Sequence, residues 1–538
     1  MDTASPPSPT EAEDRKLQRR LGFWSLLAAG VGSVIGSGWL YAAMYAAKAA
    51  GPASLLSWVV GGVLMLLVAL VYAELGMAQP ESGGLVRYPL YSHGRLAATV
   101  IGLAMWLSYV GNPPTEAAGV VQYAATWLPG VFDAATGSLT PAGIGLAVLL
   151  MAGFVLLNYY GVVWFARANN AITAFKVLVP LATVVLLLLS GFDHRAGAQG
   201  MTNWVAHGGF APMGYPAALG AVASAGLIFA YTGFRNIVEL SGEAAHPRRD
   251  IPRALVATIL LSILLYLALQ SAFVVALPAA LLHAGWQGLN LKSPFADLAQ
   301  LLGLSWLYWL LMADAMVSPS GSAIVFTSAN ARNLFGVAKN GLLPAALMQV
   351  HPASGVPRRA LLLNLLIGVA FLLPLPSWHA IVRPLSALIV FTFSIGAVSL
   401  PVFRASGRTA TGARLRGMRL IAPLAFVISS LVIYWAGWKV LAPTVPVMLL
   451  ALLWYLLQGA RTARRGLRGW FDAADWRAGS WLLVYVALLY ALAWLGSADG
   501  GHRFGLGLGS VLTTLVSLGC YRWGVRAGMR HVGIRASA

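Results

Sequence analysis

Long apolar stretches alternate with short polar segments along most of the 538-residue chain. A helix needs about 20 apolar residues to cross a bilayer, and the pattern contains fourteen stretches of roughly that length. None of the polar segments is long enough for a soluble catalytic domain. The pattern predicts an all-α polytopic membrane protein with spans at 21–48, 53–79, 96–125, 142–164, 170–190, 216–241, 254–277, 303–330, 361–376, 379–403, 418–437, 441–460, 479–497 and 505–523.

Two of these spans are interrupted by small residues. The first contains GVGSVIGSG (30–38), and Tyr231-Thr232-Gly233 interrupts the sixth, which crosses in the opposite direction. Glycine inside a helix costs about 1 kcal/mol relative to alanine, and an open backbone in lipid has no hydrogen-bond partner. Interruptions at corresponding positions of two halves indicate a transporter's binding site. The alternative is that the glycines only allow close helix packing.

An unwound helix exposes N–H groups at the start of one half and carbonyl groups at the end of the other. The carboxylate of an amino acid suits the donors, and its ammonium group suits the acceptors. We therefore expect a substrate site at these two interruptions, formed by Ser33, Ile35, Gly36, Ser37, Gly38, Phe229, Ala230, Tyr231, Thr232 and Gly233.

Composition and charge agree with a membrane protein. Hydrophobic residues make up 59% of the chain and charged residues 10%, and the formal net charge is +19. The basic residues concentrate in alternate loops, such as HPRRDIPR (246–253) and RTARRGLRG (461–469). This distribution follows the positive-inside rule, places both termini in the cytoplasm and argues against nucleic-acid binding. The single cysteine, Cys520, excludes a disulfide framework or a cysteine metal site within the chain.

Three stretches resemble the amino acid-polyamine-organocation (APC) family of permeases. They are GVGSVIGSG (30–38), FAYTGFRNIVELSGEAAHPRRDIPRAL (229–255) and SANARNLFGVAKNGLLP (328–344). The second is the most specific, and it is most similar to permeases described as aspartate-proton symporters. The resemblance implies a leucine-transporter-like fold with two inverted repeats of five helices, followed by accessory helices.

This organisation predicts a division of the chain in seven parts. They are a cytoplasmic tail at 1–20, the first repeat at 21–190, the second at 216–403, accessory spans at 418–460, a basic linker at 461–478, an extra pair of spans at 479–523 and a cytoplasmic tail at 524–538.

Lys176 lies within the predicted fifth span. A charge at the centre of a bilayer costs about 2.5–3.5 kcal/mol, so its position requires an explanation. The resemblance aligns it with a lysine of proton-coupled members that stands where sodium-coupled relatives bind an ion. Lysine can lose its proton when buried, and we predict that Lys176 couples transport to protons. Alternatively, its long side chain reaches the cytoplasmic headgroups.

Arg235 directly follows the interruption in the sixth span. A guanidinium group beside the cavity suits a second carboxylate, which favours aspartate or glutamate as the substrate. The alternative is an internal ion pair with Glu239, four residues further along the helix. Neutral or cationic amino acids or polyamines, and exchange instead of symport, remain alternatives.

Other polar and aromatic residues of the spans have less specific roles. Glu116 and Glu239 are the candidate proton acceptors, either of which could share the proton with Lys176. Asp314, which could pair with a buried base, shares the eighth span with Ser318, Ser320 and Ser322. Residues that could line the cavity or form a gate are Trp39, Glu74, Asp314, Ser318 and Ser320. Tryptophans expected to anchor the span ends at the interface are Trp106, Trp127, Trp378, Trp476 and Trp481.

These features predict a secondary active amino acid transporter in a bacterial inner membrane. The partners would be an amino acid, protons and lipid, with no nucleic acid, no cofactor and no metal. The chain has no phosphate-binding G-x-x-x-x-G-K-[ST] motif and no recognisable catalytic set. A channel or an intramembrane enzyme is therefore the weaker alternative.

Overall fold

The structure is a computed structural model that describes residues 21–81, 83–160, 163–351, 356–409, 413–464, 472–496 and 501–533. The predicted tail at 1–20 lies outside these residues. The helices are α2 (Phe23–Val34), α3 (Ser37–Ala50), α4 (Ser54–Ala78), α5 (Gly84–Val110), α6 (Asn112–Ala124), α7 (Pro141–Tyr160), α8 (Val163–Phe192), α9 (Gly214–Ser224), α10 (Leu227–Tyr231), α11 (Arg235–Glu239), α12 (Pro247–Ala276), α13 (Pro294–Leu301), α14 (Ser305–Lys339), α15 (Arg358–Leu372), α16 (Trp378–Ala405), α17 (Met418–Ala436), α18 (Trp438–Leu441), α19 (Val445–Arg464), α20 (Ala473–Gly496) and α21 (Leu506–His531).

Among the described residues, ten helical stretches are long and apolar enough to cross a membrane, or eleven if a bent pair counts as one span. One of the ten, Ser37–Ala78, holds both α3 and α4. Two of the predicted spans, α15 and α21, are outside this count. The first has 15 residues, and the second has basic residues in its last turns. The chain is thus a helical multi-pass membrane protein, and the number fourteen stays a prediction.

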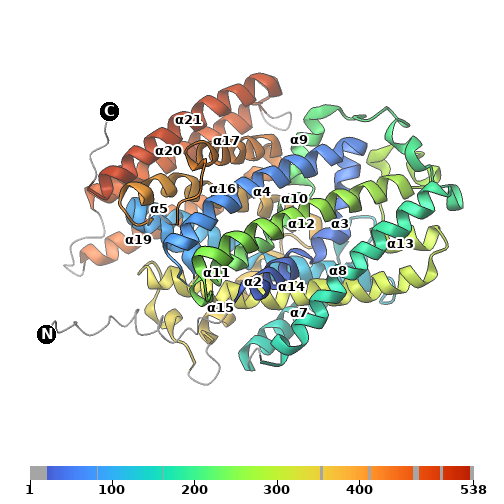
Figure 1. The fold of residues 1–538 in the computed structure, drawn as a ribbon, viewed down its shortest axis with the longest axis horizontal. Helices are drawn as coiled ribbons and strands as arrows, with labels where there is room; N and C mark the ends of the chain where they lie inside the picture. The colour runs from blue at the N-terminus through green and yellow to red at the C-terminus, as the bar shows by residue number, and fades with distance from the viewer. Residues whose placement is uncertain are drawn as a thin grey trace.

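The helices divide into central and peripheral ones. In α16, 94% of the most apolar window is buried, whereas in α7 the share is 33%. The peripheral helices expose leucines such as Leu156 on α7, Leu178 on α8 and Leu449 on α19, as expected where lipid replaces water. Helices α3 and α10 pack together near the middle of the bundle (Figure 1).

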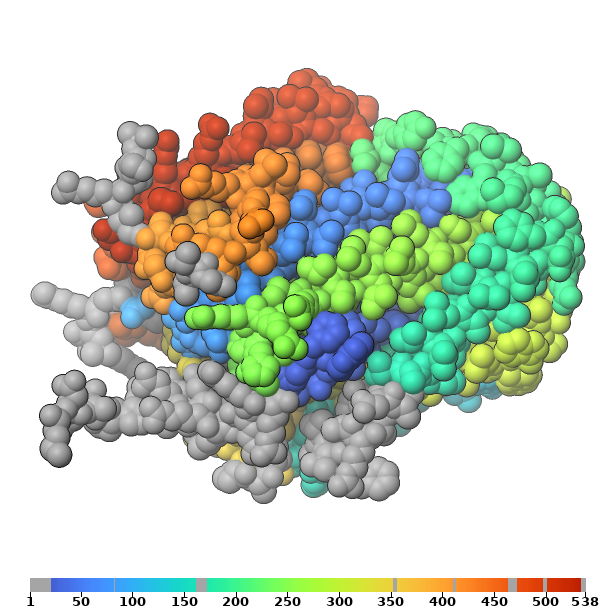
Figure 2. Space-filling view, viewed as in Figure 1, coloured from blue at the N-terminus to red at the C-terminus, as the bar shows by residue number. Residues whose placement is uncertain are grey.

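Helices α20 and α21 form one edge of the molecule, drawn in red in Figure 2. They pack on each other, and α20 also packs on α5. Both are longer than the sequence predicts. Helix α20 begins at Ala473, within the predicted linker 461–478, and α21 continues to His531, within the predicted tail 524–538. Basic side chains at these ends did not stop the helices, because charged groups can extend from a helix into solvent.

The only strands among the described residues form a small hairpin outside the bundle. Strand β1 (Phe132–Asp133) pairs antiparallel with β2 (Ser138–Leu139). Gly137 supplies the left-handed conformation that the turn requires, with φ of 66°. The hairpin joins α6 to α7 and leaves the predicted all-α class unchanged.

Candidate functional site

The first helix interruption lies within the predicted segment 30–38. Helix α2 ends at Val34, and α3 begins at Ser37. Between them Ile35 has φ −83° and ψ 87°, and Gly36 has φ −125° and ψ −144°. Two residues therefore leave the helical conformation and open the carbonyl groups of the last turn of α2.

Side chains of other helices bind these opened carbonyl groups. The ammonium group of Lys176 on α8 donates to the carbonyl oxygen of Gly32 and lies 3.0 Å from the hydroxyl oxygen of Ser322 on α14. The Ser322 hydroxyl in turn lies 3.2 Å from the carbonyl oxygen of Ile35 and 3.4 Å from that of Ser33. Protein groups, not lipid, thus satisfy the open backbone.

The start of α3 is occupied by a carboxylate. The backbone N–H of Ser37 donates to Oε2 of Glu116 on α6, at 2.7 Å. A Cβ atom on Gly36 would lie 2.5 Å from Glu116 Oε1 and 2.9 Å from the Ser322 hydroxyl oxygen. Only glycine therefore leaves room for this arrangement. The sequence analysis assigned the N-terminus of α3 to the substrate carboxylate. In this structure the carboxylate of Glu116 binds there.

The second interruption consists of a bend and a short 3₁₀ segment. The bend of 50° falls between α9 and the segment Leu227–Glu239, at Gly226, whose φ is 86°. The predicted site, Tyr231-Thr232-Gly233, is not the bend: there the chain passes from α10 into a short 3₁₀ helix, Thr232–Phe234, before α11. The α-helix is thus interrupted at the predicted position, and the larger bend lies five residues earlier, where Gly226 supplies the left-handed conformation.

Aromatic side chains surround this bend. A Cβ atom on Gly226 would lie 2.7 Å from the indole of Trp378, and the carbonyl oxygen of Ser224 accepts from His379 at 3.0 Å. Trp378 also donates to the hydroxyl of Ser37 at 2.7 Å and lies edge-to-face with Phe229, with ring centroids 6.1 Å apart. Trp378 therefore joins both interruptions.

The two interruptions are in direct contact. A Cβ atom on Gly38 would lie 2.9 Å from Cα and Cβ of Ala230, and one on Gly233 would overlap the backbone of Val34. The hydroxyl of Tyr266 on α12 lies 3.0 Å from the Val34 carbonyl oxygen and 2.9 Å from that of Ala230. The structure thus brings together residues that the sequence analysis assigned to one site, from segments about 200 residues apart.

Lys176 has 2% of its surface exposed. Its ammonium group contacts α2 and α14 inside the bundle, so the alternative of a side chain that extends to the headgroups does not describe this structure.

Arg235 is completely buried. Its guanidinium lies 4.1 Å above the ring of Tyr109, and one nitrogen donates to the Ser108 hydroxyl at 3.1 Å. Within the described part of the chain, Nε and the other terminal nitrogen have no hydrogen-bond partner. No ion pair joins Arg235 to Glu239, whose Oε1 instead accepts from Asn333 at 3.3 Å. The internal pair that sequence offered as the alternative is absent among these residues.

A cavity of about 160 Å³ lies beside α11 and α14. Polar lining residues include Glu239, Asn236, Asn158 and Ser328. Asn236 also donates to the hydroxyl of Ser33 at 2.8 Å, which ties this cavity to the first interruption.

The remaining candidates occupy varied surroundings. Asp314 accepts from the Ser318 hydroxyl at 2.6 Å. It forms no direct ion pair among the described residues but interacts electrostatically with Lys176, so the predicted pairing with a buried base stays a prediction. Trp39 packs on Phe295, with ring centroids 5.4 Å apart, and Ser320 is half-buried.

Glu74 forms a two-point ion pair with Arg404 at the end of α16, with both N–O distances 2.6 Å. It also accepts from the backbone N–H of Leu415 at 2.8 Å. This carboxylate therefore joins α4 to the end of α16 and the following loop.

Sequence missed two central residues. Tyr266 occurs in an ordinary apolar run, and Trp378 was expected at the membrane interface, as was Trp481. Both tryptophans are fully buried instead. Because Trp378 lies near a span end, the sequence favoured a place at the interface. Its ring is instead buried in the space beside Gly226 at the bend.

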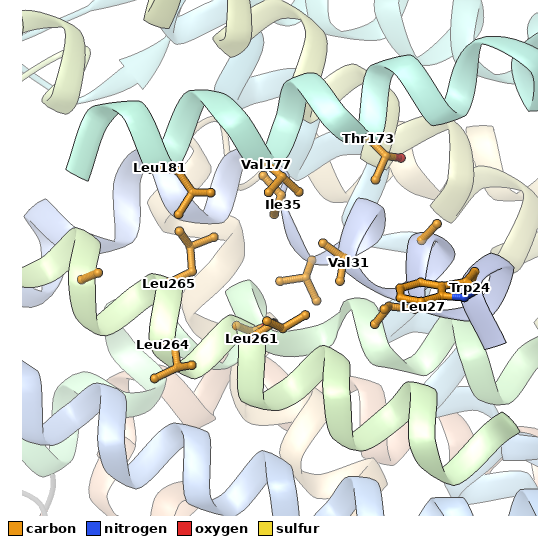
Figure 3. Close-up of a pocket in the computed structure, with 14 residues that line it drawn as sticks. Trp24, Leu27, Val31, Ile35, Thr173, Val177, Leu181, Leu261, Leu264 and Leu265 are labelled. Atoms are coloured by element: carbon orange, nitrogen blue, oxygen red, sulfur yellow. The ribbon is translucent and has the colours of Figure 1, made fainter. Parts of the chain in front are cut away.

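A different cavity, of about 600 Å³, is apolar. Figure 3 shows it between α2, α8 and α12, lined by residues such as Val31, Val177 and Leu261. Among the described side chains, none that lines it is charged, so it is not suited to an amino acid.

Contact between two broken helices inside a helical bundle is the architecture of secondary transporters. The chain belongs to the amino acid permease family, whose model matches residues 21–457. It is 37% identical to the glutamate/serine transporter AimA of Bacillus subtilis, over 95% of this chain and 94% of that protein. It is 34% identical to the aspartate-proton symporter of the same organism, over 96% and 98%.

A human relative, cationic amino acid transporter 4, is 28% identical over 73% of this chain and 60% of its own. The predicted family is confirmed, and these relatives are transporters, not enzymes. Among the described residues, no three His, Cys, Asp or Glu side chains are grouped as metal ligands would be.

Proposed function

We propose that this permease carries an acidic amino acid together with a proton by alternating access, in the bacterial cell membrane with both termini in the cytoplasm. Its two halves would form the inverted five-helix repeats. The observation that carries the proposal is the contact of the Lys176 ammonium group with the Gly32 carbonyl oxygen at the first interruption. This contact connects a titratable group to the backbone expected to bind substrate.

Substrate binding would use the two ends of the broken helices. The substrate carboxylate would accept from the N–H groups at the start of α3, where Glu116 accepts from Ser37. The substrate carboxylate would thus replace that of Glu116 at the positive end of α3. The substrate ammonium group would bind carbonyl oxygens near Phe229 and Ala230 on α10, which bind the hydroxyls of Thr232 and Tyr266 here.

Proton coupling would follow from the surroundings of Lys176. A charged ammonium group holds α2 and α14 together through Gly32 and Ser322. Loss of the proton would remove the charge from these hydrogen bonds and release α2, so that movement of α2 and protonation are linked.

Selection of the side chain would depend on Arg235, which has two buried nitrogens without a partner among the described residues. Unpaired buried donors are costly, and a substrate carboxylate would relieve that cost. The names of the two Bacillus relatives include glutamate and aspartate. One of them also includes serine, which keeps a neutral substrate as the second candidate.

The test measures binding and uptake by purified protein. Thermal shifts with each amino acid should show stabilisation by aspartate or glutamate, and uptake into proteoliposomes should increase under an inward proton gradient. Arg235→Gln should weaken aspartate and glutamate binding by 1.5–3 kcal/mol, or about tenfold or more, the value of a charged hydrogen bond, and leave serine binding in place.

Arg235→Lys is the matched control because it keeps the charge but not the planar geometry. Undiminished aspartate binding by Arg235→Gln would contradict the acidic-substrate proposal. Stabilisation by no amino acid at all would contradict the transport proposal.

A further inference from the structure

A basic cavity of about 750 Å³ lies between α20 and α21. These two helices follow the last residue of the family match, 457, and the transport proposal assigns them no role. The charged lining residues are Arg477 on α20 and Arg522, Arg526, Arg530 and His531 on α21.

The four arginines lack counter-charges. Over the described ranges, none of them has an ion-pair or hydrogen-bond partner, and all four are exposed. The nearby carboxylate of Asp475 lies 4.0 Å from His531 instead. Four like charges around one cavity repel one another, so an anion bound between them would be favourable.

The arginines continue an apolar stripe on the same face of α21. Residues at intervals of three or four lie on one helix face, and this face begins with Leu508, Val511, Leu515 and Leu518, each at least 36% exposed. Arg522, Arg526 and Arg530 follow at intervals of four. The apolar part spans about 15 Å, which is half of the roughly 30 Å hydrocarbon core.

Helix α20 repeats this order on the other side of the cavity. Val484 and Leu488 are exposed at 39% and 41%, and Arg477 lies about two and three turns, respectively, nearer the start of the helix. The space between the helices is open at Gly519, where a Cβ atom would meet no other atom within 4 Å. Beyond the basic cavity, both helices therefore expose apolar side chains at acyl-chain depth, and they expose basic side chains at headgroup depth.

We propose that α20 and α21 form a binding site for an anionic phospholipid, with the phosphate between Arg477, Arg522 and Arg526 and an acyl chain along the apolar stripe. The basic end is on the side that the charge distribution predicts to be cytoplasmic. Basic pockets between membrane helices on that side bind lipid headgroups. A soluble phosphate compound shares the headgroup chemistry but would not use the apolar stripe.

Native mass spectrometry of the full-length protein in detergent tests this site. Phosphatidylglycerol should bind about tenfold more tightly than phosphatidylcholine with the same acyl chains, as expected for two or more arginines near a phosphate. The double variant Arg522→Gln/Arg526→Gln should lose this preference. Arg416→Gln/Arg419→Gln, which removes two exposed charges elsewhere, should retain it.

Several outcomes would overturn the proposal. They are equal affinity of the unmodified protein for both lipids, an equal loss in both double variants, or displacement of phosphatidylglycerol by an equal concentration of glycerol 3-phosphate. The variant Arg522→Lys/Arg526→Lys retains both charges and is the control for misfolding. It should keep most of the preference for phosphatidylglycerol, and loss of that preference in this variant would also contradict the proposal.

Discussion

The two helix interruptions are satisfied by different chemistry. Charged and hydroxyl groups meet the first: Lys176 and Ser322 at the end of α2, and Glu116 at the start of α3. At the second bend, the ring of Trp378 occupies the space beside Gly226 and His379 binds the last carbonyl of α9. The first interruption is thus surrounded by charged and hydroxyl groups, and the second by aromatic rings.

This difference suggests a division of tasks between the two helices. Changes at the first should alter ligand and proton binding, because its partners are ionisable. Changes at the second, or at the contact between them, should alter stability and packing. The following variants test this division, beginning with the largest expected effect.

Gly233→Ala should be the most damaging change. A Cβ atom at this position would overlap the Val34 backbone at the contact between the interruptions, and overpacking costs about 1–3 kcal/mol. We expect a lower melting temperature and loss of uptake. Gly153→Ala, where a Cβ atom meets nothing within 4 Å, should change neither, and equal effects of both variants would contradict the close contact.

Tyr266→Phe should destabilise the protein without changing its charge. The lost hydroxyl leaves the Ala230 carbonyl group without this donor, whereas the Val34 carbonyl group keeps the Gly36 N–H at 3.1 Å. Loss of a buried hydrogen-bond partner costs about 1–3 kcal/mol. Thermal unfolding followed by fluorescence measures the loss. Tyr215→Phe on α9, at a position 60% exposed, is the control and should unfold like the unmodified protein.

Glu116→Gln should strengthen substrate binding. The neutral amide competes less well than a carboxylate for the start of α3, and a charge at a helix N-terminus is worth up to about 1 kcal/mol, or about fivefold in affinity. Titration of aspartate by calorimetry measures this change. Glu116→Asp keeps the charge and should show no gain. Weaker binding by Glu116→Gln would mean that Glu116 assists the substrate instead of competing with it.

The sequence predicted much of this site because its strongest signals are local. The glycines at 30–38 mark the first interruption, and charges at Lys176 and Arg235 stand out in apolar spans. The interruption at Thr232–Phe234 lies where the sequence predicts it, but the bend at Gly226 was not predicted, because several glycines of this span are compatible with a bend and only packing distinguishes them.

Partners supplied by distant helices could not be predicted. Tyr266 lies 232 residues from Val34 in sequence, and Trp378 lies 341 residues from Ser37. A tyrosine or tryptophan in an apolar span has many possible neighbours, and its sequence surroundings do not specify which carbonyl or hydroxyl group it meets.

The most direct test of the account is the response of Lys176 variants to a proton gradient. In proteoliposomes, uptake of aspartate or glutamate by the unmodified protein should be faster with an acidic outside than without a proton gradient. Lys176→Ala should lose this acceleration but still exchange labelled for unlabelled substrate, and Lys176→Arg, which keeps its proton, should lose it too. Unchanged acceleration by the proton gradient in Lys176→Ala would contradict the account.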